Sequence, residues 1–162
     1  MTIIKRTDDA LLDVAGIANG RLRDILGIDQ WTSARVLIRL FLALVVASQI
    51  AMVLERGFAW GNMLILGVWI WHYSVAASGI ERYARSPHGS SIARITERPH
   101  RSMYPFIYAA LTLVVGTAGT HVSGLLMLAG WAAMIGTHYV KAAEMPPASR
   151  RSGRTVLSFQ KG

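Results

Sequence analysis

The chain has 162 residues, of which 52% are hydrophobic and only 16% are charged, and its formal net charge is +8. A charged fraction well below the roughly 25% of soluble proteins, in a chain long enough for one compact domain, argues against an ordinary water-soluble fold. Cysteine is absent, which excludes disulfides, thiolate metal sites and redox-active thiols.

The first segment, residues 1–35, is predicted to be cytoplasmic and to contain an amphipathic helix over residues 7–28. Thr7 is suited to cap this helix, and a break is expected near Asn19 and Gly20. Apolar residues recur at intervals of three and four along it: Leu11, Val14, Ala15, Ala18, Leu22 and Ile25. Such a helix lies on a bilayer surface, docks on a partner, or covers the end of the protein's own helix bundle.

Long apolar runs follow at 36–54, 61–80, 104–122 and 124–141. Each has about the 17–25 residues that an α-helix needs to cross the hydrocarbon core of a bilayer. The pattern therefore predicts an all-α integral membrane protein with four transmembrane helices in a domain over 36–142. A basic loop at 81–103 separates the second and third spans, and a flexible basic tail is expected at 143–162.

The positive charge is concentrated before the first span, in the 81–103 loop and after the fourth span. Lysine and arginine are retained on the cytoplasmic side of short membrane loops, so both termini and this loop are predicted to be cytoplasmic. The composition suggests a bacterial inner (plasma) membrane. Nucleic-acid binding is disfavoured, because the arginines fit topology signals and contacts with anionic lipid better. These are Arg35, Arg39, Arg82, Arg85, Arg94, Arg98 and Arg101.

Small residues spaced four apart mark surfaces where membrane helices can approach closely. One such stripe lies in the first span and another in the third. Their members are Ala43, Ala47 and Ala51, and Thr112, Gly116 and Thr120. Both stripes are predicted to form helix–helix seams, either within the chain or between copies of it.

Two histidines lie inside predicted spans. At 1.5 Å per residue, His72 is about 17 Å and His138 about 21 Å below the outer boundary of the bilayer. Two imidazoles at similar depth could hold a haem b between their helices, an arrangement that resembles many small membrane cytochromes. The favoured interpretation is simpler: each ring donates a hydrogen bond to a carbonyl or hydroxyl group on a neighbouring helix, and no cofactor is bound.

The sequence favours no catalytic function. No aspartate or glutamate lies inside a predicted span, which argues against a cation-coupled transporter, and hydrolase motifs are absent. The predicted function is a non-enzymatic structural or accessory subunit of a larger membrane assembly, with lipid and other membrane subunits or itself as partners. The alternatives are an electron-transfer protein that binds haem b through His72 and His138, and a pore-forming protein of the phage holin type.

Overall fold

The computed structural model describes residues 3–101, 103 and 121–143, and most of these residues are helical, without any strand among them. The helices are α1 (Ile3–Leu26), α2 (Gln30–Arg56), α3 (Trp60–Ala84), α4 (Gly89–Thr96) and α6 (Val122–Ala142). Residues 104–120 lie outside the described part, and with them most of the predicted third span and its stripe of Thr112, Gly116 and Thr120. The predicted tail also lies outside it, except for Ala143.

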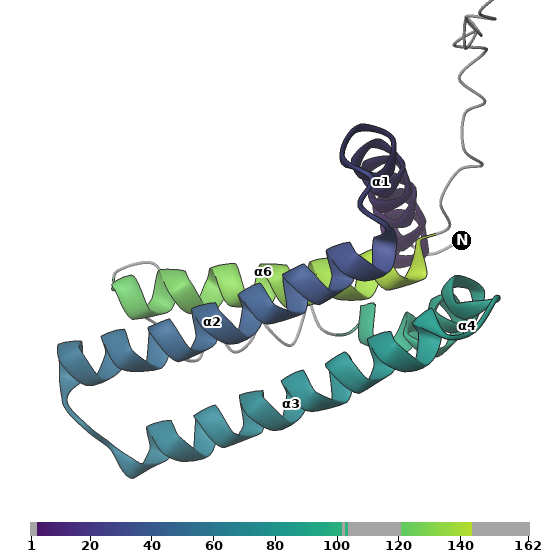
Figure 1. Ribbon diagram of the computed structural model, residues 1–162. Helices are drawn as coiled ribbons and strands as arrows, with labels where there is room; N and C mark the ends of the chain where they lie inside the picture. The colour runs from purple at the N-terminus through teal and green to yellow at the C-terminus, as the bar shows by residue number, and fades with distance from the viewer. Residues whose placement is uncertain (1–2, 102, 104–120, 144–162) are drawn as a thin grey trace, which may run out of the picture.

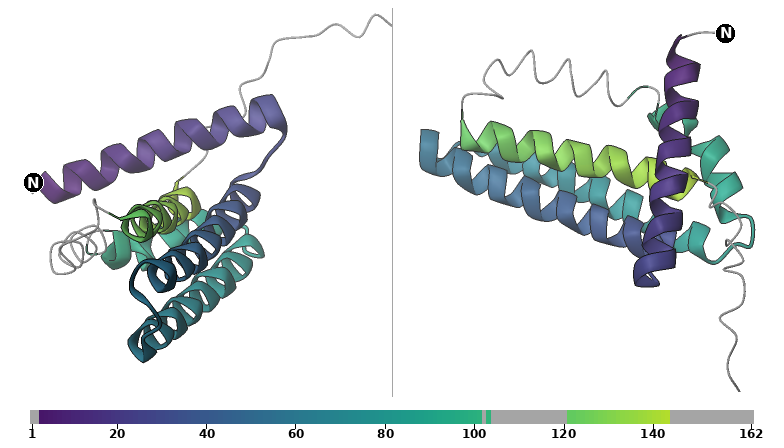
Figure 2. Two further views of the ribbon diagram at one scale, coloured as in Figure 1. Left: turned by 90° about the vertical axis from the view of Figure 1, so that its left-hand side faces the viewer. Right: turned by 90° about the horizontal axis from the view of Figure 1, so that it is seen from above.

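The three long helices α2, α3 and α6 run side by side, with α2 between the other two (Figure 1). The first helix, α1, crosses the ends of α2 and α6 at a steep angle (Figure 2). The short helix α4 packs against the last turns of α3 and α6 at the same end. We call this the basic end, because Arg35 and Arg39 lie in the first turns of α2, Arg82 lies in the last turn of α3, and Arg85 follows that turn.

Two of the described helices are long and apolar enough to cross a membrane. Their most apolar 18-residue windows have mean hydropathies of 2.3 in α2 and 1.5 in α3. These helices contain the predicted spans 36–54 and 61–80, and α6 contains the predicted helix at 124–141. The four-span arrangement and its orientation stay predictions.

The main core lies between α2 and α6. Phe41 and Val45 of α2 are buried against Met134 of α6. A side chain at Gly130 would bring its Cβ within 3.4 Å of Val45 Cγ2, so the missing side chain allows the two helices to approach closely. The predicted stripe on α2 lies away from this core, because Ala43 is exposed and Ala47 and Ala51 are half-buried. A seam along that stripe therefore stays a prediction.

α1 is continuous from Ile3 to Leu26, so the predicted break near Asn19 is wrong and the helix begins before Thr7. Contacts with α6 hold its middle in place. Leu12 packs against Tyr139, and the Asn19 side-chain amide donates a hydrogen bond to the backbone carbonyl of Val140 at 3.3 Å. The buried partner on α6 thus outweighs the low helix propensity of this stretch.

The turn between α1 and α2 is defined by local chemistry. Gly27 adopts a φ of 69°, a conformation that residues with a side chain rarely adopt. Asp29 then caps α2, because its carboxylate accepts a hydrogen bond from the Thr32 amide at 2.6 Å. That bond lowers the pKa of Asp29. The turn therefore directs α2 steeply away from α1.

Candidate functional site: a buried polar cluster at the basic end

Glu97, which follows α4, is folded back against α6 and is only 7% exposed. One carboxylate oxygen accepts a hydrogen bond from Lys141 Nζ at 2.9 Å, and the other contacts His138 Nδ1. His138 and Lys141 are three residues apart on α6 and therefore share a face. One carboxylate thus joins both side chains and attaches the segment after α4 to α6.

The charge balance explains why Glu97 can be buried. Burial alone raises the pKa of a carboxyl group, because it disfavours the charged form. Here the His138 hydrogen bond and the charge of Lys141 outweigh burial and lower the pKa of Glu97 from 4.5 to about 2. Glu97 is therefore a carboxylate at neutral pH, paired with the ammonium group of Lys141.

Aromatic and imidazole rings surround this cluster. His100 Nδ1 lies 3.7 Å from the Glu97 carboxylate, and the His100 ring centroid is 5.8 Å from that of His138. Lys141 Nζ lies 5.8 Å from the centre of the Tyr83 ring, within the range of a cation–π contact. The cluster therefore combines groups from α3, α6 and the segment after α4.

A second buried ion pair lies beside the first. Arg101 is 2% exposed, and its Nε and Nη2 atoms donate to the two oxygens of Asp8 at 3.1 and 3.4 Å. Nη2 also donates to the carbonyl of Arg94, and the guanidinium lies 5.8 Å from the centre of the Tyr139 ring. The sequence led us to expect that Arg101 contacts lipid phosphate. In the structure it is buried instead and holds α1 against the rest of the protein.

The other predicted lipid-facing arginines lie nearer the surface. Arg35 forms an exposed ion pair with Glu81, in which its Nε lies 2.8 Å from the carboxylate. Arg94 is half-buried. The remaining members of the set are exposed: Arg39, Arg82, Arg85 and Arg98. Their positions are compatible with contacts to lipid headgroups.

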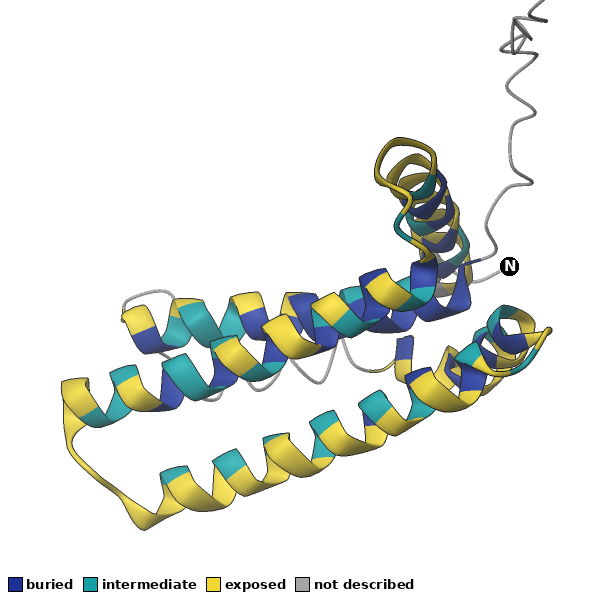
Figure 3. Cartoon of the chain, viewed as in Figure 1, coloured by how far each residue is buried: buried dark blue, intermediate teal, exposed yellow. Residues whose placement is uncertain are grey.

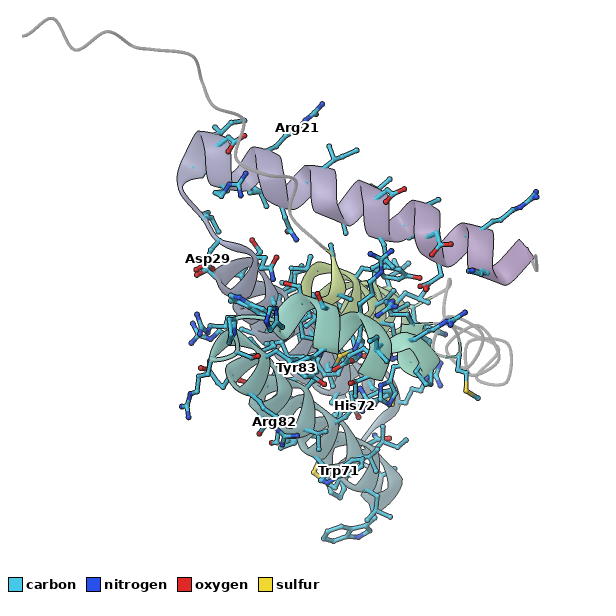
Figure 4. The ribbon with its side chains drawn as sticks, turned by 90° about the vertical axis from the view of Figure 1, so that its right-hand side faces the viewer. Arg21, Asp29, Trp71, His72, Arg82 and Tyr83 are labelled. Atoms are coloured by element: carbon cyan, nitrogen blue, oxygen red, sulfur yellow. The ribbon has the colours of Figure 1, made fainter. Side chains whose placement is uncertain are left out.

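The two histidines singled out in the sequence have different surroundings. His72 of α3 packs edge-on to Phe41 and Trp69, with ring centroids 6.4 and 6.2 Å away. Figure 4 views the molecule from the basic end and labels His72 and its neighbour Trp71 on α3; Trp71 is 65% exposed. His138 is bound to Glu97 through Nδ1. The partner of His138 is therefore a carboxylate from the segment after α4, and not the carbonyl or hydroxyl of a neighbouring span that the sequence favoured.

The chemistry of the cluster is that of an ion-pair network. Its groups are a carboxylate, an ammonium, imidazoles and phenols, and none of them is a thiol or an activated hydroxyl. Among the described residues, no group of three or more histidine, cysteine, aspartate or glutamate side chains is placed to hold a metal ion. The haem hypothesis for His72 and His138 stays a prediction that an absorption spectrum tests.

Sequence reasoning missed Glu97, although one signal was present. Lys141 and His138 share a face of an apolar helix, and a buried lysine requires a carboxylate or another acceptor. The loop 81–103 offers two carboxylates for this purpose, Glu81 and Glu97. The choice between them depends on how the loop folds, which the sequence pattern does not reveal.

A scan against protein-family models and searches of the curated proteins and of the solved structures gave no match to this chain.

Proposed function

We propose that the chain is a non-enzymatic, multi-pass helical membrane protein that acts as a structural or accessory subunit of a larger membrane assembly. In this proposal the four predicted spans cross a bacterial inner membrane, and the basic end faces the cytoplasm. α1 then lies at the membrane surface. The function needs no cofactor of its own.

The observation that carries the proposal is the exposure of α3. Only 11% of its most apolar window is buried, whereas the core helix of a soluble protein is mostly buried. Large apolar side chains of α3 remain exposed, because no other described helix covers them. They include Leu64, Ile65, Val68, Trp71 and Val75, which are 47–74% exposed.

The free-energy cost of leaving these side chains in water is large. Fully burying one large apolar side chain contributes about 1.5–3 kcal/mol, so five side chains that are about half to three-quarters exposed correspond to roughly 5–9 kcal/mol. This is comparable to the entire stability of an average domain, about 5–15 kcal/mol. A contiguous apolar surface of this kind is typical of a helix that contacts lipid or another protein.

The buried cluster supports a structural role. A carboxylate that is paired with Lys141 and His138 fixes one arrangement of α4 and α6, and breaking such a network costs more than an exposed ion pair contributes. α1 fits the same role, because its apolar residues Leu11, Val14 and Ile25 remain exposed while the opposite part of the helix docks on α6. This stripe is suited to the bilayer interface.

Site-specific photo-crosslinking in native membranes tests the proposal. A photoreactive residue replaces Val68 on α3 or, as a matched control, Leu40 on α2, which is also exposed. We expect discrete protein adducts at Val68, whose mass spectra identify the partner subunit or a second copy of the chain. Lipid adducts alone at both positions would contradict the subunit role. Recovery of the chain in the aqueous fraction without detergent would contradict membrane insertion.

A further inference from the structure

A groove of about 300 Å³ lies between α2 and α3 at the basic end. Arg35, Arg39 and Glu81 form its polar part, and Ile38, Tyr73 and Ala77 form its apolar wall. It is separate from the Glu97 cluster, none of whose members lines it.

The polar and apolar residues of the groove occupy different levels along the two helices. Arg35 and Arg39 are one turn apart on α2. Tyr73, Ala77 and Glu81 recur every four residues on α3, so they follow one face of that helix. Tyr73 therefore lies about 12 Å deeper along α3 than Glu81. The groove is charged where the helices approach the basic end and apolar toward the middle of the expected membrane.

The groove has an excess of positive charge, which favours binding of an anion. Arg35 engages both oxygens of Glu81, at 2.8 and 3.3 Å. Arg39 is exposed and has no ion-pair partner among the described residues, although its charge acts on Glu81. Two guanidinium groups against one carboxylate give the groove a net charge of one positive unit. Guanidinium groups bind phosphate oxygens through pairs of parallel hydrogen bonds.

We propose that this groove binds a single phospholipid with an anionic headgroup. Its phosphate contacts Arg39 and competes with Glu81 for Arg35, and the start of an acyl chain lies over Ile38, Tyr73 and Ala77. Basic pockets between membrane helices on the cytoplasmic side bind anionic headgroups in this way. The apolar wall favours a lipid over free phosphate. This inference rests on the proposed membrane function.

The experiment measures lipid binding to the detergent-purified full chain by native mass spectrometry, with phosphatidylglycerol and phosphatidylcholine as probes. We expect one phosphatidylglycerol to bind in preference to phosphatidylcholine. Arg39→Gln should weaken phosphatidylglycerol binding about tenfold, because hydrogen bonds to a charged group are lost. Arg82→Gln is the matched control, because it removes the same charge from an exposed site outside the groove, and it should change binding less than twofold.

A third variant sharpens the test. Glu81→Gln removes the carboxylate that competes for Arg35, so it should strengthen phosphatidylglycerol binding severalfold. Equal weakening by Arg39→Gln and Arg82→Gln would overturn the proposal in favour of diffuse electrostatic attraction. Complete displacement of the lipid by excess inorganic phosphate would overturn it in favour of a simple anion site. A chain that remains in membranes but shows either result loses the groove proposal alone, whereas a chain soluble without detergent loses both proposals.

Discussion

One end of the helix bundle buries charged side chains, whereas the other end exposes apolar ones. At the basic end, Glu97, Lys141 and Arg101 are buried and paired. At the other end, which we call the apolar end, Leu54 and Trp60 are 81% and 79% exposed. Figure 3 shows this contrast as buried residues gathered near α1 and α4 and an exposed far half of α3. A soluble protein has the reverse preference. Our proposal accounts for the contrast by placing Leu54 and Trp60 at the outer boundary of the bilayer, where apolar and aromatic side chains are favourable.

The apolar end also contains one polar connection. Glu55 at the end of α2 accepts hydrogen bonds from the backbone amide and the hydroxyl of Ser123, at 3.2 and 2.6 Å. Ser48 donates to the carbonyl of Ser123 at 2.7 Å. A carboxylate at the beginning of α6 is favourable because it satisfies free amides there. This contact joins α2 to α6 without any buried basic residue, unlike the network at the basic end.

The largest effect is expected from removing the carboxylate of the buried network. Glu97→Ala leaves Lys141 and His138 buried without their partner, which should lower the free energy of unfolding by about 3–5 kcal/mol. Glu81→Ala, which removes an exposed carboxylate paired with Arg35, is the control and should have no measurable effect. Both are measured by chemical unfolding in detergent micelles. Equal stabilities for the two variants would contradict the claim that the buried Glu97 network contributes more to stability than the exposed Arg35–Glu81 ion pair.

The same contribution should disappear gradually at low pH. The pKa of Glu97 is about 2 in the folded chain, below its ordinary value of 4.5, so the folded state binds its proton less readily than the unfolded state does. The resulting stability is complete above about pH 4.5 and is lost as the pH falls toward 2. Unfolding measured across this range should show a decline for the parent chain and a flatter profile for Glu97→Gln. If the stability of the two chains depended on pH in the same way, the lowered pKa of Glu97 would not be the cause of the decline.

A smaller effect is expected where α1 docks. Asp8→Asn leaves the Arg101 guanidinium buried without its charged partner and should destabilise the docked position of α1 by about 1.5–3 kcal/mol. Limited proteolysis near Gly27 should then become faster. Asp13→Asn, at an exposed position on the same helix, is the control. Unchanged cleavage in Asp8→Asn would show that the ion pair does not hold α1.

The smallest effect concerns the packing of α2 on α6. Gly130→Leu introduces a side chain next to Val45 Cγ2, which a Cβ would approach to 3.4 Å, and should cost about 1–3 kcal/mol. Gly67→Leu is a matched control on α3, because nothing lies within 4 Å of a Cβ at that position. Thermal unfolding in detergent compares the two. A greater loss of thermal stability in Gly67→Leu than in Gly130→Leu would indicate that α3, and not the α2–α6 core, is tightly packed in the protein.

The helices could be predicted from the sequence, whereas their polar contacts could not. The apolar runs at 36–54, 61–80 and 124–141 lie within α2, α3 and α6, because the length and composition of a run are local properties. The contact of Glu97 with His138 spans 41 residues and that of Asp8 with Arg101 spans 93. Such pairs depend on how the loops fold back onto the bundle. The sequence contains several carboxylates and several basic residues, and its pattern does not show which of them pair.

The same reason accounts for two local features that the sequence did not reveal. Arg101 resembles every other arginine of the basic loop in sequence, and only its position beside Asp8 makes it a buried residue. Asn19 precedes a glycine and therefore resembles a helix end, yet its side chain binds the backbone of α6. In both cases a partner far away in the sequence decides the outcome.

The most direct test of the account is the accessibility of single cysteines, which the cysteine-free chain makes simple to place. Phe58→Cys lies in the connection between α2 and α3, and Ser91→Cys lies on α4; both positions are exposed. A membrane-impermeant maleimide applied to intact cells should label position 58 and should label position 91 only after the membrane is opened. Equal labelling of both positions in intact cells would contradict a chain that crosses the bilayer with its basic end inside.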